Sequence, residues 1–389
     1  MRRYAVADEV RVALARRLKD WRKAGLLSTE QEQALRADLT TDLRRTGLML
    51  RLGLAVFTVI AGAAAVGLAF LVTDIRSEVA VSIMCGLLAA AALGAATVLV
   101  RDAKLYRHGV EEALAVGAVG LAAFAVGLLS TEVFSNSSGS QAWFFAMVAV
   151  TAMGVEVYRR FGLQYVAVGA LYAAALLPMA FSSIGTEAKR LFAALVCAGA
   201  FVAASRARRR ADNDVRRDDT EVLRAAALAG AYLALNTQIL LEPFGRGVDR
   251  WFHWGTWGLT WILPVVGVRL AVADRDPLLL RIALASGLAS VLTNKSYLGW
   301  PRQPWDPMLL GVLLIAVALV LRRWLAAGTD GERNGFTARQ LIESEGATIQ
   351  AVSLVSVAAQ PLPERHPHEP ADPSFTGGRS GGGGGGSEF

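Results

Sequence analysis

Apolar positions near the N-terminus follow a helical pattern. Within residues 1–46, four apolar residues recur at the spacing of one helix face: Val10, Leu14, Leu18 and Trp21. Gly25 is suited to end that helix, and Ser28 with Gln31 forms a capping box that begins a second one. The second helix is expected to carry an apolar stripe of its own: Leu35, Leu39 and Leu43. The pattern therefore predicts a hairpin of two short amphipathic helices.

The rest of the chain, up to Leu325, is dominated by apolar runs that recur without any strand-like alternation. Most of them approach 20 residues, which is long enough to cross a hydrocarbon core of about 30 Å. The predicted fold is all-α, a polytopic transmembrane bundle of about ten spans. The expected spans are 52–72, 79–100, 111–130, 142–158, 162–182, 191–205, 222–241, 255–272, 277–293 and 307–325.

Composition supports the membrane assignment. Of the 389 residues, 54% are apolar and only 19% are charged, and the mean hydropathy is +0.40. Soluble domains carry about 25% charged residues. These values exclude a soluble enzyme, a secreted disulfide scaffold and a disordered protein. No cleavable signal is expected before the first span, which should stay as an uncleaved helix.

Two further patterns concern helix packing. Both cysteines, Cys85 and Cys197, lie inside apolar runs, where they are expected to be small buried residues and not a disulfide or a metal pair. Small residues allow helices to approach closely in lipid. The following are expected to form packing surfaces: 61–65, 89–96, Gly117, Gly120 and Gly127.

The distribution of basic residues predicts an orientation. With the N-terminus inside, the inner loops carry 12 Lys and Arg residues and the outer loops 7, with Arg190 counted among the outer ones. The positive-inside rule then places both termini in the cytoplasm. The arginine-rich loop 206–217 can also bind anionic lipid. The net charge of +7 is explained by these loops, and nucleic acid is not expected as a partner because no reading motif accompanies the charge.

Four regions are predicted along the chain. Residues 1–46 form the cytoplasmic hairpin and 47–325 the transmembrane bundle. Residues 326–360 form a cytoplasmic segment in which Thr337 and Gln340 can cap a short helix. Residues 361–389, rich in Pro and Gly, are expected to be disordered.

The hairpin contains a recognisable sequence motif, which runs from Trp21 through Gly25, Leu26, Leu27 and Ser28 to Gln31. It resembles the segment that opens the bacterial membrane proteins grouped under domain of unknown function 2157. The resemblance covers about 45 residues, and beyond them it extends only to the general layout. It implies a multi-pass protein of the bacterial inner membrane. It assigns no catalytic residue. Because so short a hairpin buries little area, it is expected to lean on the membrane, on the rest of the protein or on a partner. The candidate partner-binding residues are Trp21, Gly25, Leu26 and Ser28.

Ionisable and amide side chains inside the spans are costly, and they are candidates for function. Glu156 can relay a proton or cation, or it can pair with Arg159 or Arg160. Arg281 can hold an anion, or its side chain can reach the inner surface. Asn236 and Gln238 can line a path, or they can hydrogen-bond between helices.

Aromatic residues gather on the predicted outer face. The candidate cluster consists of Trp251, His253, Trp254, Trp257 and Trp300. These rings can form an interfacial belt, or a cage for a sugar, a quaternary amine or a lipid headgroup. One histidine is too few for a zinc site, so neither a metal nor another cofactor is expected.

Three hypotheses about function follow. The first is a non-enzymatic integral membrane protein with a sensing, scaffolding or envelope role that acts through its cytoplasmic ends. The second is a transporter or channel for a small solute or ion, lined by the intramembrane polar residues. The third is a lipid- or glycan-processing enzyme that uses the outer aromatic face. Enzymatic activity is the less favoured, because the chain has only four histidines and no nucleophile beside a base.

Overall fold

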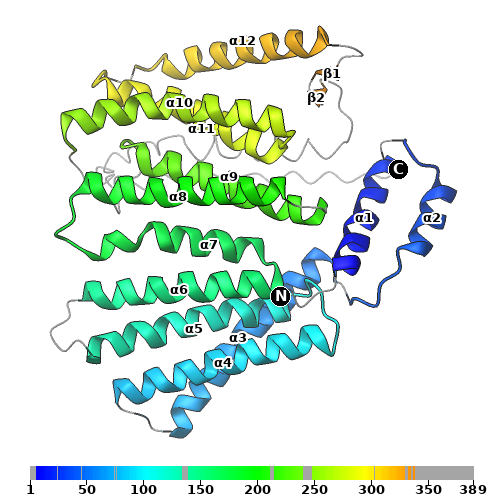
Figure 1. Ribbon diagram of the computed structural model, residues 1–389, viewed down its shortest axis with the longest axis vertical. Helices are drawn as coiled ribbons and strands as arrows, with labels where there is room; N and C mark the ends of the chain where they lie inside the picture. Colours follow the sequence, from blue (N-terminus) through cyan, green and yellow to red (C-terminus); the bar gives the residue numbers. More distant parts are fainter. Residues whose placement is uncertain are drawn as a thin grey trace, which may run out of the picture. The chain divides into compact units, whose positions relative to one another are not determined.

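The computed structural model is built almost entirely from helices (Figure 1). It describes residues 6–23, 25–44, 46–73, 75, 77–133, 139–210, 214–239, 248–301, 303–328, 332–333 and 336–337. The chain divides into two units, 1–339 and 340–389. All of the second unit, including the predicted disordered tail 361–389, lies outside the described residues.

Eight helices of the described part are long and apolar enough to cross a membrane, so the prediction of an all-α membrane protein is confirmed. They are α3 (Leu48–Thr73), α4 (Glu78–Arg101), α5 (Val110–Val133), α6 (Gly139–Phe161), α8 (Thr186–Arg209), α10 (Arg250–Asp274), α11 (Pro277–Tyr297) and α12 (Asp306–Ala326). Each coincides with a predicted span and extends beyond it at one or both ends.

The other two predicted spans, 162–182 and 222–241, are occupied by helices that differ from the expectation. Helix α7 (Gln164–Ala175) is short, because Pro178 sets up the 3₁₀ turn η1 (Leu177–Ala180) beyond it. Helix α9 (Asp214–Leu235) begins in a charged segment and ends before Asn236, earlier than predicted. A count of ten spans therefore stays a prediction.

From α4 to α11, neighbouring helices along the chain pack side by side (Figure 1). Helices α3 to α7 follow one another, with α5 packed on α3, α4 and α6. Helices α8 to α11 continue the series, with α9 packed on α7, α8, α10 and α11. The long helices alternate in direction, so the ends of α4, α6, α8 and α10 share one side with the starts of α5, α7, α9 and α11. We call this the first end of the bundle; under the predicted orientation it faces the cytoplasm.

Small residues mediate several of the closest approaches, as expected in lipid. A Cβ added at Gly267 of α10 would lie 2.9 Å from the Cβ of Ala283, and one at Gly127 would lie 3.3 Å from the Ala142 oxygen. The expectation was wrong for Gly117 and Gly120, which have open space around them. Residues 61–65 are also largely exposed.

In α3 and α12 none of the most apolar stretch is buried inside the described protein. Both cysteines are free and buried, as predicted.

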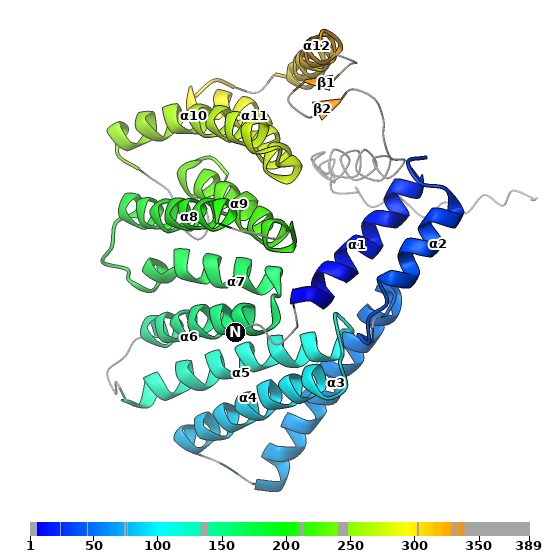
Figure 2. The ribbon, with the colours of Figure 1, turned by 45° about the vertical axis from the view of Figure 1, so that its right-hand side comes forward.

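Two short helices precede the bundle: α1 (Val6–Lys23) and α2 (Thr29–Asp38). The two helices contact each other and lie at the first end of the bundle (Figure 2). Helix α2 ends before Leu39 and Leu43, so the expected three-leucine stripe is wrong. Thr40 and Thr41 follow soon after the end of α2, and their β-branched side chains disfavour continuation of the helix. At the other end of the described chain, Thr337 belongs to strand β2 (Phe336–Thr337), which pairs antiparallel with β1 (Glu332–Arg333).

Candidate functional site

The turn between α1 and α2 has the geometry that its sequence predicts. Gly25 adopts a positive φ of +73°, a conformation that favours glycine, and so reverses the chain after α1. The Ser28 hydroxyl oxygen accepts the Gln31 amide at 3.2 Å, and the Ser28 amide donates to the Gln31 side chain at 3.0 Å. The capping box is thus complete. An ion pair between Arg22 and the largely buried Glu32, at 2.9 Å, ties the two helices together.

The hairpin is not a loose appendage, because α1 packs on the bundle. Val12 is only 2% exposed and belongs to the same buried cluster as Tyr106, Phe161 and Leu163, which lie at the first end. Helix α1 also contacts α9. Its buried residues therefore differ from the predicted stripe, since Leu18 is buried as expected whereas Trp21 is 39% exposed.

The segment after α2 is attached to the loop between α4 and α5. The Arg44 amide donates to the Lys104 carbonyl oxygen at 3.0 Å, and the Tyr106 amide donates to the Arg44 carbonyl oxygen at 3.1 Å. The Lys104 ammonium donates to Asp42 at 2.8 Å and holds the pKa of that carboxyl below its ordinary value. Further on, the Thr46 hydroxyl donates to the His108 carbonyl oxygen.

An ion pair continues this attachment into the first turns of α3 and α5. Arg51 donates to both oxygens of Glu112, at 2.7 and 2.5 Å, in a bidentate arrangement. The neighbouring Glu111 is 2% exposed and accepts the His108 amide at 2.7 Å. The two adjacent carboxylates thus serve different partners, because successive residues of a helix point in different directions.

Three apolar side chains of the hairpin are exposed. Leu26 is 71% exposed, Leu35 42% and Trp21 39%, although all three side chains are apolar. A shallow pocket of about 290 Å³ lies between the helices and is lined by polar residues: Arg22, Thr29, Glu32, Gln33 and Arg36. We call Trp21, Leu26, Leu35 and this pocket the hairpin surface. It combines apolar contact area with basic side chains.

The intramembrane candidates are distributed over different helices. Glu156 of α6 accepts Arg160 at 2.6 Å and lies 4.0 Å from Arg159. This agrees with the pairing that we considered for it. Arg281 is an exposed residue of α11. Helix α6 packs on α5 and α7, whereas α11 packs on α9 and α10.

Asn236 and Gln238 lie together just beyond α9, and the Gln238 amide donates to the Asn236 side chain at 3.0 Å. Asn236 is 0% exposed and donates to the hydroxyls of Tyr232, at 3.0 Å, and Thr293, at 3.2 Å. The Tyr232 hydroxyl is in turn 3.0 Å from Ser290 of α11. These contacts match the hypothesis of hydrogen bonds between helices.

The aromatic candidates divide between exposed and packed rings. Trp251 is 67% exposed, Trp254 46% and Trp300 61%. His253 instead packs against Tyr297, with ring centroids 4.9 Å apart, and its Nε2 lies 3.0 Å from the Tyr297 carbonyl oxygen. Trp257 donates to Asn294 at 3.0 Å. Part of the cluster therefore connects α10 to α11.

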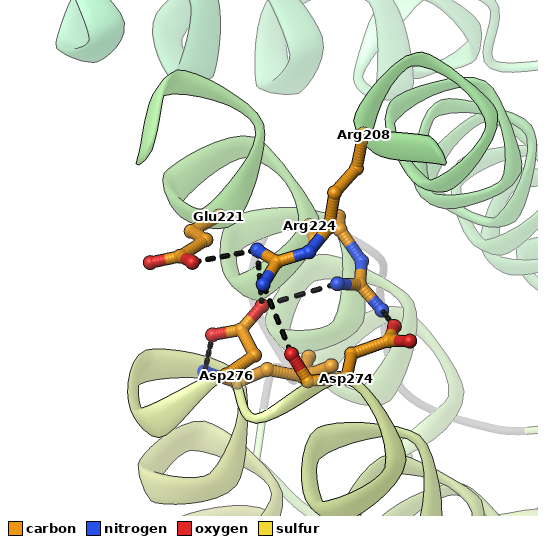
Figure 3. Close-up of polar contacts among 6 residues, drawn as sticks. Arg208, Glu221, Arg224, Asp274 and Asp276 are labelled. Carbon is orange, nitrogen blue, oxygen red and sulfur yellow. Dashed lines mark hydrogen bonds and ion pairs between the residues drawn. The ribbon is translucent and has the colours of Figure 1, made fainter. Parts of the chain in front are cut away.

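A partly buried network of charges, with Arg224 and Asp276 at its centre, joins α8, α9, α10 and the start of α11 at the first end, and the sequence pattern did not reveal it (Figure 3). Arg224 is 1% exposed and donates to Asp274 at 2.5 Å and to Asp276 at 3.2 Å. Arg208 donates to Glu221 at 2.6 Å and lies 3.6 Å from Asp276. The signal was present in the sequence, because Asp276 directly before Pro277 is a helix start and Arg224 lies inside a predicted span.

A second buried arginine, Arg190, had been counted among the basic residues of the outer loops, and this assignment was wrong. Arg190 lies within α8, not in an outer loop, and is 1% exposed. It donates to the carbonyl oxygens of Ala234, at 3.0 Å, and Asn236, at 3.3 Å. Arg190 thus caps the C-terminal end of α9.

The arginine-rich loop 206–217 is described only in part. Residues 211–213 and the side chains up to position 219 lie outside the described residues.

A scan against family models, a search of curated proteins and a search of solved structures each find no match.

Proposed function

We propose that this chain is a non-enzymatic protein of the bacterial inner membrane with a sensing or scaffolding role, and that its hairpin surface binds a protein partner in the cytoplasm. The observation that carries the proposal is the exposure of Leu26, Leu35 and Trp21 on a hairpin whose other face is packed on the bundle. Exposed apolar side chains rimmed by polar ones are typical of protein interaction sites.

The attachment of the hairpin supports this role. Five contacts hold residues 42–51 against residues 104–112: two backbone hydrogen bonds of Arg44, the Thr46–His108 hydrogen bond, the Asp42–Lys104 pair and the Arg51–Glu112 pair. A partner bound to the hairpin surface is thereby connected to the helices inside the membrane. Such a connection suits a protein that anchors a partner at the membrane or reports its binding.

Photo-crosslinking tests the proposal in cells. A photoreactive amino acid at Leu35 should form a discrete adduct with a protein partner, identified by mass spectrometry. The same amino acid at Leu68 of α3, which is 60% exposed on an apolar helix, is the control for random capture. The double variant Leu26→Glu, Leu35→Glu should lose the complex while keeping the melting temperature of the wild type.

A matched control introduces two charges elsewhere on the same segment. Ala37→Glu with Thr40→Glu changes two exposed positions and should leave the complex intact. Equal loss of the complex in both double variants would show a diffuse charge effect. No adduct at Leu35 beyond that seen at Leu68 would contradict the proposal.

A further inference from the structure

Helix α10 carries a proline in its interior. Pro264 lies near the middle of the 25 residues of α10, a helix long and apolar enough to cross a membrane. In an uninterrupted helix the carbonyl oxygen of Thr260 would accept the backbone amide of residue 264, but proline has no amide hydrogen. Thr260 is 1% exposed, so bulk water does not reach it. Its carbonyl oxygen therefore needs a different donor.

Ser290 of α11 supplies that donor. Its hydroxyl oxygen lies 2.6 Å from the Thr260 carbonyl oxygen, and Ser290 is itself 1% exposed. The two helices are in register for this contact. A Cβ added at Gly287, one turn before Ser290, would lie 3.6 Å from the Cβ of Pro264. The proline and the hydroxyl that compensates for it thus face each other across the contact between α10 and α11.

The Ser290 hydroxyl has a second acceptor within reach, in its own helix. The Ser286 carbonyl oxygen lies 3.0 Å from Ser290 Oγ. Because a hydroxyl has one proton, Ser290 donates either to Thr260 of α10 or to Ser286 of α11. Ser290 stays hydrogen-bonded in both arrangements, whereas the Thr260 carbonyl is satisfied in one of them. The bond between the helices can therefore be released without leaving the serine unpaired.

Helix α9 favours the arrangement in which the bond to α10 is made. The Asn236 side chain donates to the Tyr232 hydroxyl at 3.0 Å, and the Tyr232 hydroxyl lies 3.0 Å from Ser290 Oγ. Because Tyr232 accepts from Asn236, its own proton is directed to Ser290 Oγ. Ser290 in turn donates to the Thr260 carbonyl oxygen, the nearer of its two acceptors. A directional chain of hydrogen bonds thus runs from the end of α9 to the break in α10.

The two halves of α10 are held differently. Residues 265–274 are fixed by the ion pair of Asp274 with the buried Arg224 and by the close packing of Gly267 on Ala283. Residues 250–263 are bound to α11 by hydrogen bonds that join three pairs: Thr260 with Ser290, Trp257 with Asn294, and His253 with Tyr297. Hydrogen bonds between neutral groups contribute less net stability than those to charged groups. Residues 250–263 are therefore the half that can move.

We propose that Pro264 is a hinge in α10, and that the Ser290 hydroxyl, held by Tyr232, is the latch that keeps residues 250–263 against α11. Opening of the hinge moves the exposed aromatic start of α10 relative to the other helices. Ser290 acts as a positioning residue in this device. The proposal does not depend on the partner of the hairpin surface.

Hydrogen–deuterium exchange of the purified full chain in detergent, followed by mass spectrometry, tests the latch. Ser290→Ala should accelerate amide exchange in residues 250–263 about five-fold, because one buried hydrogen bond is lost. Exchange in residues 265–274 should stay unchanged. Ser286→Ala is the matched control, since the Ser286 hydroxyl donates to the Ile282 carbonyl oxygen within α11, and it should leave both halves unchanged. Equal acceleration of both halves by Ser290→Ala would overturn the hinge in favour of general loosening.

Removal of the proline shows whether the serine compensates for it. Pro264→Ala restores an amide that can donate to the Thr260 carbonyl oxygen within α10. In this background Ser290→Ala should change exchange in residues 250–263 by less than about two-fold. The same acceleration with and without the proline would overturn the proposal. If Ser290→Ala does not fold by itself, recovery of folding in the double variant would support the latch, and continued failure would contradict it.

Tyr232→Phe tests the chain of hydrogen bonds from α9. It removes the hydroxyl beside Ser290 and leaves both ends of the latch in place. Exchange in residues 250–263 should accelerate, because the Ser290 proton can then turn to Ser286. Tyr172→Phe is the control, since the Tyr172 hydroxyl donates to the Ala226 carbonyl oxygen of α9 at 3.0 Å, away from the latch. Unchanged exchange in Tyr232→Phe would overturn the role of Tyr232 in holding the latch.

Discussion

Arg224 and Asp276 are 52 residues apart in the sequence, yet they form an ion pair in which neither residue is more than 1% exposed. Asp276 also accepts the Leu279 amide at 2.9 Å, so one carboxylate both caps α11 and neutralises an arginine of α9. Two charges buried in this way are stabilising only while both are present, because a single buried charge without its partner is costly.

Asp276→Asn separates these two roles. The amide oxygen of asparagine can still accept the Leu279 amide, whereas Arg224 loses its buried carboxylate partner and keeps only the more exposed Asp274. We expect the free energy of unfolding to fall by about 3 kcal/mol, measured by denaturant titration in detergent. Asp276→Ala should cost about 1 kcal/mol more, because it also removes the cap.

Glu156→Gln is the control for this prediction. Glu156 pairs with Arg160 at a side-chain exposure of 37%, and partly exposed pairs contribute little. Its loss should change the free energy of unfolding much less than Asp276→Asn does. Equal effects of Asp276→Asn and Glu156→Gln would show that burial of the network does not matter.

The approach of α5 to α3 gives a second prediction. A Cβ at Gly109, whose φ is +103°, would lie 2.2 Å from the Arg51 carbonyl oxygen. Gly109→Ala therefore forces backbone movement, and we expect it to lower the free energy of unfolding by about 2–4 kcal/mol. Gly117 lies inside α5 with open space around it, and Gly117→Ala should be nearly neutral. A neutral Gly109→Ala would show that the loop adjusts without cost.

The hairpin and the eight long spans could be predicted because their signals are local. Ser28 and Gln31 satisfy each other across a single turn, and an apolar run of about 20 residues has few alternatives to a membrane helix. The ends of α7 and α9 were harder to place. Hydropathy does not show where Pro178 breaks a helix, or that a carbonyl at Asn236 is satisfied by Arg190 from another helix.

The sequence marks Asp276 and Arg224 individually, but the pairing of charges in the network could not be predicted because its members are distant in sequence. Arg208 was assigned to topology, and Asp274 and Asp276 belonged to a short loop. Only packing of α9 against α10 and α11 brings these charges together. The small-residue rule failed at Gly117 for a related reason, since a sequence shows which surfaces can pack closely but not which of them meet another helix.

The capping box leads to a third prediction, which concerns the stability of the hairpin alone. Ser28→Ala removes the acceptor of the Gln31 amide and should destabilise α2 by about 1 kcal/mol. Hydrogen exchange of the amides in the first turns of α2 should then accelerate about five-fold, while exchange in α5 stays unchanged. Thr29→Ala, at the neighbouring exposed position, is the control. The same exchange rates in Ser28→Ala and the wild type would mean that the cap does not hold the helix.

The pair of Asp42 and Lys104 leads to a prediction about pH. Because Lys104 lowers the pKa of the Asp42 carboxyl in the folded state, the pair stabilises the protein above the ordinary aspartate pKa. This contribution is lost as the pH falls through the lowered folded-state pKa. A carbon-detected NMR titration of Asp42 should give a midpoint below the ordinary value. Lys104→Gln should raise that midpoint, and Lys104→Arg should largely restore it, since arginine keeps the charge. A midpoint that does not respond to Lys104→Gln would show that Lys104 is not the cause of the lowered pKa.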